Sequence, residues 1–201
     1  VREDGEKSVW SLTEGRRATV ENAKKAADMG VDMIVLTGNP GVGVDNKAIT
    51  KALADLNEAV GDRVILTAGK MHASGILSEA GEKILTKEDA ETFIEAGADV
   101  LLLPAPGTVP GFTMEHAAEL IKTAHEKGVL AMTTIGTSQE GADEETIRQI
   151  ALMCKMAGAD IHHIGDSGYM GMALPENITA YSVAIRGKRH TYRRMAMSLV
   201  R

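Results

Sequence analysis

The chain has few of the residues that mark several classes of protein. Of its 201 residues, one is cysteine and 3% are aromatic. The lone Cys154 cannot form an internal disulfide, which indicates a reducing, cytoplasmic location. No signal peptide is visible, and no apolar run approaches the ~20 residues of a membrane span. We therefore expect a cytoplasmic protein without membrane attachment, whose core is built from aliphatic side chains.

The net charge of −6 is distributed unevenly. Residues 186–201 carry six Lys and Arg and no acid, whereas the remainder has 16 basic and 28 acidic residues. Such a segment could bind nucleic acid or another anion, or it could be a helix whose basic face meets the acidic body or a partner subunit. No nucleic-acid-binding motif accompanies the charge. We therefore expect a homo-oligomer that binds no nucleic acid.

A short apolar run bounded by glycine recurs along the chain. It reads GVDMIVLTG from residue 30, GADVLLLPA from residue 97 and GADIHHIGD from residue 158, with looser copies at residues 61–69 and 128–136. The runs begin near residues 33, 64, 100, 129 and 161, which are 31, 36, 29 and 32 residues apart. This spacing is typical of one βα unit, so the sequence predicts five of them.

Helical periodicity fills the gaps between the runs. Apolar residues recur every three or four positions over residues 20–29, 47–60, 87–96, 114–127 and 144–157. Thr86 begins a capping box, and Thr113 and Asp143 are good N-caps. Glycines follow four of these segments, as helix C-termini prefer; they are residues 30, 97, 128 and 158.

Strands that alternate with helices predict an α/β protein with a parallel sheet. We expect a (β/α)8 TIM-type barrel that is N-terminally incomplete, because five clear units in 201 residues are fewer than the ~250-residue barrel needs. The alternative is a doubly wound open parallel sheet. We treat residues 1–201 as one domain, with residues 1–10 partly loop or remnant strand and residues 175–201 as C-terminal helices with the basic tail.

In both architectures ligands bind at the carboxyl ends of the strands. The segments that follow the predicted strands are rich in glycine and polar residues, whereas the opposite junctions are plain Gly-Ala-Asp turns. Strand alternation refines this picture. It predicts that residues 34, 36, 101, 103, 162 and 164 face the helices. The other parity faces the barrel interior, so His163 points inward and His162 outward.

Two loops after the last strands could bind a phosphate. Their glycine N–H groups and hydroxyls can surround an anion without obstruction by Cβ atoms, and barrels often bind phosphate at this place. The residues are Gly136, Thr137 and Ser138 in one loop, with Gly165, Ser167 and Gly168 in the other. The structural alternative is a pair of tight turns. Asn39 lies in a glycine-rich loop that lacks the Walker pattern, and we expect it to cover the substrate.

Lys70 is the strongest catalytic candidate. It follows the second predicted strand, and it could form a Schiff base, act as a base or hold an anionic group. His72, His163 and Asp166 are further candidates for proton transfer. These three could also share a divalent metal ion, although their spacing matches no metal motif. Each has a structural alternative, such as a solvated loop residue, a core histidine or a helix cap.

Long segments of the chain resemble an uncharacterised bacterial family of predicted TIM-barrel proteins of unknown function. They are residues 35–41 (VLTGNPG), 68–72 (AGKMH), 107–111 (GTVPG), 135–150, 160–166 (DIHHIGD) and 184–194. The resemblance implies the barrel fold and that this chain corresponds to the C-terminal two-thirds of longer members. Some members carry the label haloacid dehalogenase-like hydrolase. No strand here ends in the Asp-x-Asp pattern of that superfamily, so the sequence does not support the label.

Three functions follow from these features. The first is an enzyme that binds a small phosphorylated metabolite and performs aldolase, isomerase or epimerase chemistry. The second is a metal-dependent hydrolase or lyase. The third is a non-catalytic regulatory or assembly protein that uses its basic C-terminal helix. The polar strand ends favour the first.

Overall fold

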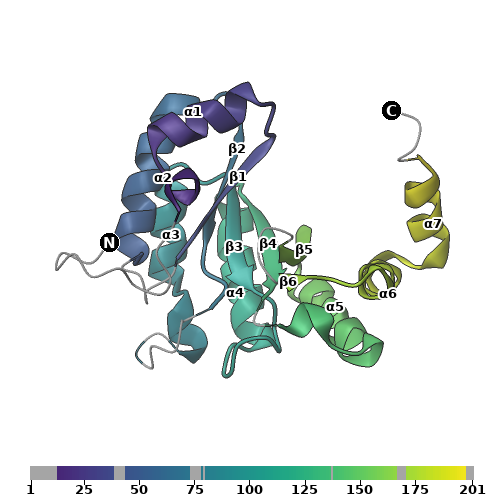
Figure 1. The fold of residues 1–201 in the computed structure, drawn as a ribbon. Coiled ribbons are helices and arrows are strands. Elements are labelled where there is room, and N and C mark those ends of the chain that lie inside the picture. The colour runs from purple at the N-terminus through teal and green to yellow at the C-terminus, as the bar shows by residue number, and fades with distance from the viewer. Residues whose placement is uncertain are drawn as a thin grey trace.

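The computed structural model describes residues 13–38, 44–72, 78, 80–136, 138–166 and 171–197 (Figure 1). The strands are β1 (Met33–Thr37), β2 (Ile65–Gly69), β3 (Val100–Pro104), β4 (Leu130–Ile135), β5 (Ile161–Asp166) and β6 (Gly171–Met172). The α-helices are α1 (Val20–Asp28), α2 (Asn46–Val60), α3 (Lys87–Glu95), α4 (Met114–Glu126), α5 (Glu144–Ala157), α6 (Pro175–Arg186) and α7 (Lys188–Met197). Short 3-10 helices are η1 (Glu14–Arg16), η4 (Gly81–Ile84) and η5 (Gln139–Gly141). The expected loop or remnant strand of residues 1–10 lies outside the described residues.

The predicted βα alternation is confirmed, and so are its local signals. Thr86 accepts a hydrogen bond from the backbone N–H of Asp89, whose carboxylate accepts one from the N–H of Thr86, which completes the capping box of α3. Thr113 and Asp143 cap α4 and α5. The four glycines that follow helices all have positive φ, from 76° to 107°. This left-handed backbone is strained for residues with a Cβ atom, so these helices end where the sequence predicts.

The parallel strands follow one another in the sheet in chain order, from β1 to β5. Parallel βαβ connections are nearly always right-handed, so an unreversed strand order keeps every connecting helix on the same face. A doubly wound sheet needs a reversal of strand order, and that alternative is wrong. The sheet curls with its helices outside, as Figure 1 shows. The fold is a partial (β/α) barrel.

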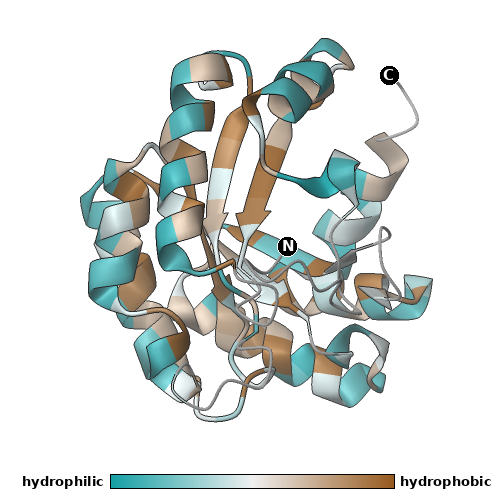
Figure 2. Cartoon of the chain, turned by 60° about the vertical axis from the view of Figure 1, so that its left-hand side comes forward, coloured by the Kyte–Doolittle hydropathy of each residue, from teal (hydrophilic) through white to brown (hydrophobic). Residues whose placement is uncertain are grey.

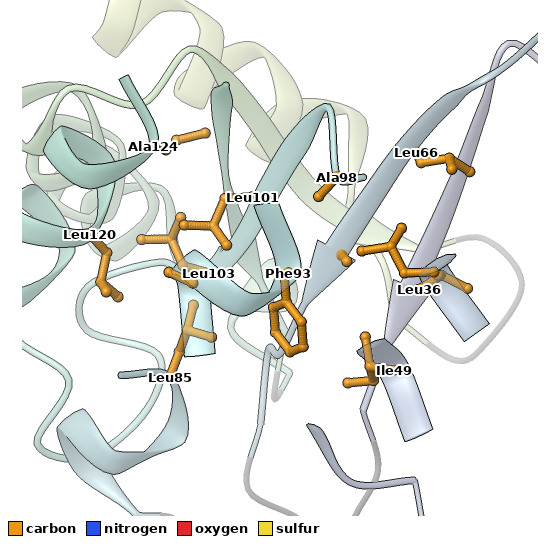
Figure 3. Packing of buried hydrophobic residues seen from close by; sticks show 14 of the residues in the cluster. Leu36, Ile49, Leu66, Leu85, Phe93, Ala98, Leu101, Leu103, Leu120 and Ala124 are labelled. Carbon is orange, nitrogen blue, oxygen red and sulfur yellow. The ribbon is translucent and has the colours of Figure 1, made fainter. Parts of the chain in front are cut away.

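The main core lies between the convex face of the sheet and the helices. Leu66 and Leu101 of neighbouring strands are fully buried against Leu53 of α2, Phe93 of α3 and Leu120 of α4. Figure 3 shows Phe93 among the leucines of the strands. In Figure 2 the strands are mostly brown and the helices mix brown with teal, as amphipathic helices do. Aliphatic packing therefore replaces the missing aromatics.

The concave face carries a second, smaller cluster. Val100, Leu102 and Met132 are buried there, and they pack with Met33 and Ile161. Alternate residues of each strand thus lie on opposite faces of the sheet, as predicted, and residues 34, 36, 101 and 103 lie on the helix side.

The repeated Gly-Ala-Asp turns have a structural role. Asp99, just before β3, accepts a hydrogen bond of 2.9 Å from the N–H of Leu66 in β2. Asp160, just before β5, accepts one of 2.8 Å from the N–H of Ala131 in β4 and another of 2.8 Å from His125. The aspartates therefore join adjacent strands at the amino end of the barrel, which leaves the opposite end for ligands.

The last elements depart from the repeat. β6 pairs antiparallel with β5, which the sequence did not indicate. α6 packs against α5, and α7 follows a sharp change of direction at Gly187, so that it stands apart from the sheet in Figure 1. Within the described residues, no helix combines the length and the apolar character needed to cross a membrane.

Candidate active site

The carboxyl ends of the parallel strands carry loops that touch one another. A Cβ atom built on Gly38, after β1, would lie 3.3 Å from Cε of Lys70, after β2. One built on Gly136, after β4, would lie 3.5 Å from Sδ of Met71. One built on Gly165 would lie 3.2 Å from Cγ of Glu140. The segment after β1 therefore approaches Lys70, and the segment after β4 approaches Met71 beside it.

Among the described residues, Lys70 is the largest side chain that is almost completely buried, with 1% of its surface exposed. The residue before it, Gly69, is the last of β2, and its carbonyl oxygen accepts a hydrogen bond of 3.3 Å from the N–H of Gly38. Lysine is rarely buried, because removing an ammonium group from water costs several kcal/mol unless it is paired. Lys70 is thus buried at the carboxyl end of a parallel strand, which is the end where barrels bind their ligands.

His72 follows two residues later and is half-buried. Burial lowers the pKa of its imidazole below the usual value of a histidine. The lowered pKa favours the neutral form of the ring at pH 7.

The two adjacent histidines of β5 face opposite sides, as predicted. Nδ1 of His162 shares a hydrogen bond of 2.9 Å with the hydroxyl of Tyr181 in α6, on the helix side. Burial, together with the nearby Arg186, lowers the pKa of His162. His163 pairs in register with Thr134 on the concave face. His163 thus lies inside the barrel, whereas His162 belongs to a buried network between sheet and helix.

The candidate phosphate loops are described in part. Gly136 and Ser138 follow β4, and Ser138 is the only residue other than glycine with positive φ, at 73°, among the described ranges. Gly165 also has positive φ, and a Cβ there would lie 2.0 Å from the carbonyl oxygen of Gly171. The pairing of β5 with β6 therefore requires a glycine at 165, independently of any ligand. Asn39, Thr137, Ser167 and Gly168 lie outside the described residues, as does the side chain of Asp166.

Glu140 is a strand-end residue that the sequence analysis missed. It lies in η5 with only 6% of its surface exposed, beside Gly165. Asn177 of α6, also buried, donates hydrogen bonds of 2.8 Å to the carbonyl oxygens of Glu140 and Ala142. An acid in a glycine-rich loop is ordinarily exposed, so no sequence signal separates Glu140 from its neighbours. The contact with α6, 37 residues away along the chain, buries it.

A metal site receives no support in the described part of the chain. No group of three or more His, Cys, Asp and Glu side chains there is arranged to hold a metal ion. The single cysteine, Cys154, is buried in α5, and burial raises the pKa of its thiol. Cys154 is therefore neither a ligand nor a reactive nucleophile in this arrangement.

The basic C-terminal segment forms one face of α7 and the end of α6. The side chains of Arg186, His190, Arg193, Arg194 and Met197 surround a shallow depression of about 400 Å³. Spacings of three and four residues place the members from α7 along one face of that helix, next to Arg186 at the end of α6. This basic face lies apart from the strand ends (Figure 1).

Solved structures with a similar fold include two aldolases and a synthase that act on sugar phosphates. Deoxyribose phosphate aldolase from Aeropyrum pernix, a tetramer, matches with a TM-score of 0.57 and 20% identity, over 85% of this chain and 68% of that chain. 3-Hexulose-6-phosphate synthase matches with a TM-score of 0.54 and 19% identity, over 84% of this chain and 70% of that chain. An archaeal fructose-1,6-bisphosphate aldolase matches with a TM-score of 0.52 and 19% identity, over 70% of this chain and 52% of that chain. In that structure the catalytic Lys is covalently bound to the carbinolamine intermediate of the substrate. These likenesses show the fold, and the chain spans about two thirds of the first two structures and about half of the third.

At the level of sequence, no curated protein matches the chain. A family model described as "Domain of unknown function (DUF7916)" matches residues 1–201. The comparisons do not bear on the haloacid dehalogenase-like label. The chain belongs to the DUF7916 family, a family of unknown function.

Proposed function

We propose that this protein is a lyase that cleaves or forms a carbon–carbon bond in a small phosphorylated carbonyl compound, with Lys70 as the Schiff-base amine. The observation that carries the proposal is the burial of Lys70 at the carboxyl end of β2. Aldolases among the proteins of similar fold support the reaction class, and one of them uses a catalytic lysine. Isomerase or epimerase chemistry on the same substrates is the nearest variant, because it also begins at a carbonyl group.

The reaction balances with groups of this chain. Nζ of Lys70, after it gives up a proton, attacks the carbonyl carbon, and proton transfers followed by loss of water give a protonated imine. His72 then takes the proton of the hydroxyl group two carbons from the imine carbon, while the carbon–carbon bond breaks and its electrons form an enamine. The first product leaves as an aldehyde. A proton returns to the enamine carbon, and one water molecule hydrolyses the imine to release the second product and Lys70. In this scheme His163 and Asp166 orient the substrate.

The phosphate of the substrate would bind at the loops after β4 and β5. Gly136, Thr137, Ser138, Ser167 and Gly168 are the candidate residues, and Asn39 is the candidate covering residue. The backbone N–H groups of such loops attract anions without a charged side chain.

Calorimetry with inorganic phosphate tests this binding site. The wild-type protein is expected to bind phosphate, and Gly136→Asp is expected to weaken binding about tenfold or more, since a carboxylate at that position repels the anion. Ser167→Ala is expected to weaken it less. Gly141→Asp is the matched control, because Gly141 is exposed and open space surrounds it. Unchanged phosphate affinity in both Gly136→Asp and Ser167→Ala would contradict the site.

A second candidate function, assembly through the basic face of α7, is favoured by the position of that helix. α7 stands apart from the sheet and exposes Tyr192, Met195 and Met197 beside its arginines. The acidic remainder of a second copy of the chain complements the charge of this helix, and we therefore propose a homo-oligomer. We also propose a cytoplasmic location. No observation in the described residues favours the metal-dependent alternative.

Deletion of residues 187–201 tests the assembly function. Sedimentation equilibrium is expected to show a lower oligomeric mass for the truncated protein than for the full chain. The double variant Arg193→Glu, Arg194→Glu keeps the helix length and is expected to have the same effect if charge drives the contact. If both variants keep the oligomeric mass of the full chain, assembly does not depend on α7.

A further inference from the structure

The loop between β4 and α5 holds a buried carboxylate. β4 ends at Ile135, Ser138 then adopts a left-handed backbone, and η5 carries Glu140 at its centre. Serine has a Cβ atom, so a left-handed backbone at Ser138 costs free energy. The conformation persists because the surrounding structure holds it in place. The loop is therefore a fixed structure that presents Glu140.

Asn177 fixes the backbone on both sides of this carboxylate. Its Nδ2 donates to the carbonyl oxygens of Glu140 and Ala142, at 2.8 Å each, and its side chain is buried at the start of α6. On the other side the aliphatic part of Glu140 lies against Gly165, where the absence of a Cβ leaves it room. The side chain is thus held between α6 and the carboxyl end of β5.

The carboxylate itself has an unmet hydrogen-bonding requirement. Oε2 of Glu140 is buried and accepts no hydrogen bond from any described residue. The structural carboxylates of the chain differ, because Asp99 and Asp160 each accept a backbone N–H and hold two strands together. A buried carboxylate oxygen without a donor destabilises the folded protein. A ligand that supplies the donor would remove this cost.

We propose that Glu140 is a substrate-binding residue of the strand-end site, and that its Oε2 accepts a hydrogen bond from a hydroxyl group of the substrate. The inference rests on the proposed function and adds the substrate class, a polyhydroxylated carbonyl phosphate. In this arrangement the phosphate binds to backbone N–H groups of the loops after β4 and β5, and Glu140 contacts the hydroxylated carbon chain, because a carboxylate repels phosphate. Glu140 thereby selects hydroxylated substrates over deoxygenated ones.

Binding of two unreactive probes tests the assignment. Ribitol 5-phosphate carries a row of hydroxyl groups, whereas pentane-1,5-diol monophosphate has the same chain length without the internal hydroxyls. Calorimetry of the wild-type protein is expected to show tighter binding of ribitol 5-phosphate. Glu140→Met is expected to weaken that binding about tenfold or more, with a smaller loss in Glu140→Gln, while the affinity for pentanediol monophosphate stays unchanged. Glu119→Gln, an exposed position on α4, is the matched control.

Thermal unfolding without ligand separates binding from a structural role. Because Oε2 has no hydrogen-bond partner among the described residues, Glu140→Gln is expected to unfold at the same temperature as the wild-type protein or a higher one. A midpoint lowered by several degrees in both Glu140 variants would overturn the assignment, and so would equal losses of affinity for the two probes. If the wild-type protein binds neither phosphate probe, the proposed function fails, and the role of Glu140 fails with it. If it binds both equally and the Glu140 variants do the same, the role of Glu140 alone fails.

Discussion

Gly69→Ala is expected to destabilise the folded protein strongly, because the methyl group would collide with the backbone of the next strand. A Cβ atom at this position would lie 1.8 Å from the carbonyl oxygen of Leu102. Neither group can rotate away, since Gly69 pairs with Leu102 in the sheet. We expect a loss of at least about 3 kcal/mol, a large part of the 5–15 kcal/mol that stabilises typical domains. Urea unfolding followed by circular dichroism measures it.

Gly136→Ala is the matched control at another strand end. A Cβ at Gly136 would meet the flexible side chain of Met71 at 3.5 Å, which is ordinary contact, so we expect a change within about 1 kcal/mol. If Gly69→Ala unfolds at the same urea concentration as Gly136→Ala, the described approach of β2 to β3 is wrong.

Lys70→Met is expected to abolish activity while the protein remains folded. Methionine has a similar length and no charge, so it can occupy the buried site without an ammonium group. Loss of the amine that forms the imine is expected to lower kcat/KM by roughly three orders of magnitude or more. A panel of phosphorylated aldoses and ketoses, assayed in both the cleavage and condensation directions, identifies the substrate for this measurement.

Two further variants make this result specific. Lys47→Met removes an exposed lysine of α2 and is expected to leave activity unchanged. Lys70→Arg keeps the positive charge but forms no imine, so it separates covalent chemistry from anion binding. Substantial activity in Lys70→Arg would show that Lys70 holds an anion, and activity of Lys70→Met within tenfold of wild type would remove it from the mechanism.

The fold was predictable because its signals are local. Capping residues such as Thr86, glycines after helices and apolar runs of strand length each act within a few residues, and they fix the element boundaries nearly residue by residue. The strand period of two also assigned His162 and His163 to opposite faces. The two-residue strand β6 was not predictable, because its pairing depends on the return of the chain to β5.

The candidate site was predictable only in its location. Strand ends could be recognised from their glycine and polar residues, and Lys70 was found in this way. Its near-complete burial depends on contacts between separate loops, which no sequence pattern records. Glu140 was missed for the same reason, because Asn177 and Gly165 enclose it from distant parts of the chain. Conversely, Gly165 looked like a phosphate-binding residue, although the approach of Gly171 already requires a glycine there.

Reductive trapping tests the central claim, that Lys70 forms a Schiff base. The protein is incubated with dihydroxyacetone phosphate or glyceraldehyde 3-phosphate, reduced with sodium borohydride, digested and analysed by mass spectrometry. We expect a reduced adduct on the peptide that contains Lys70 and none on that peptide in Lys70→Arg. An unmodified Lys70 under conditions in which the enzyme turns over its substrate would contradict the account.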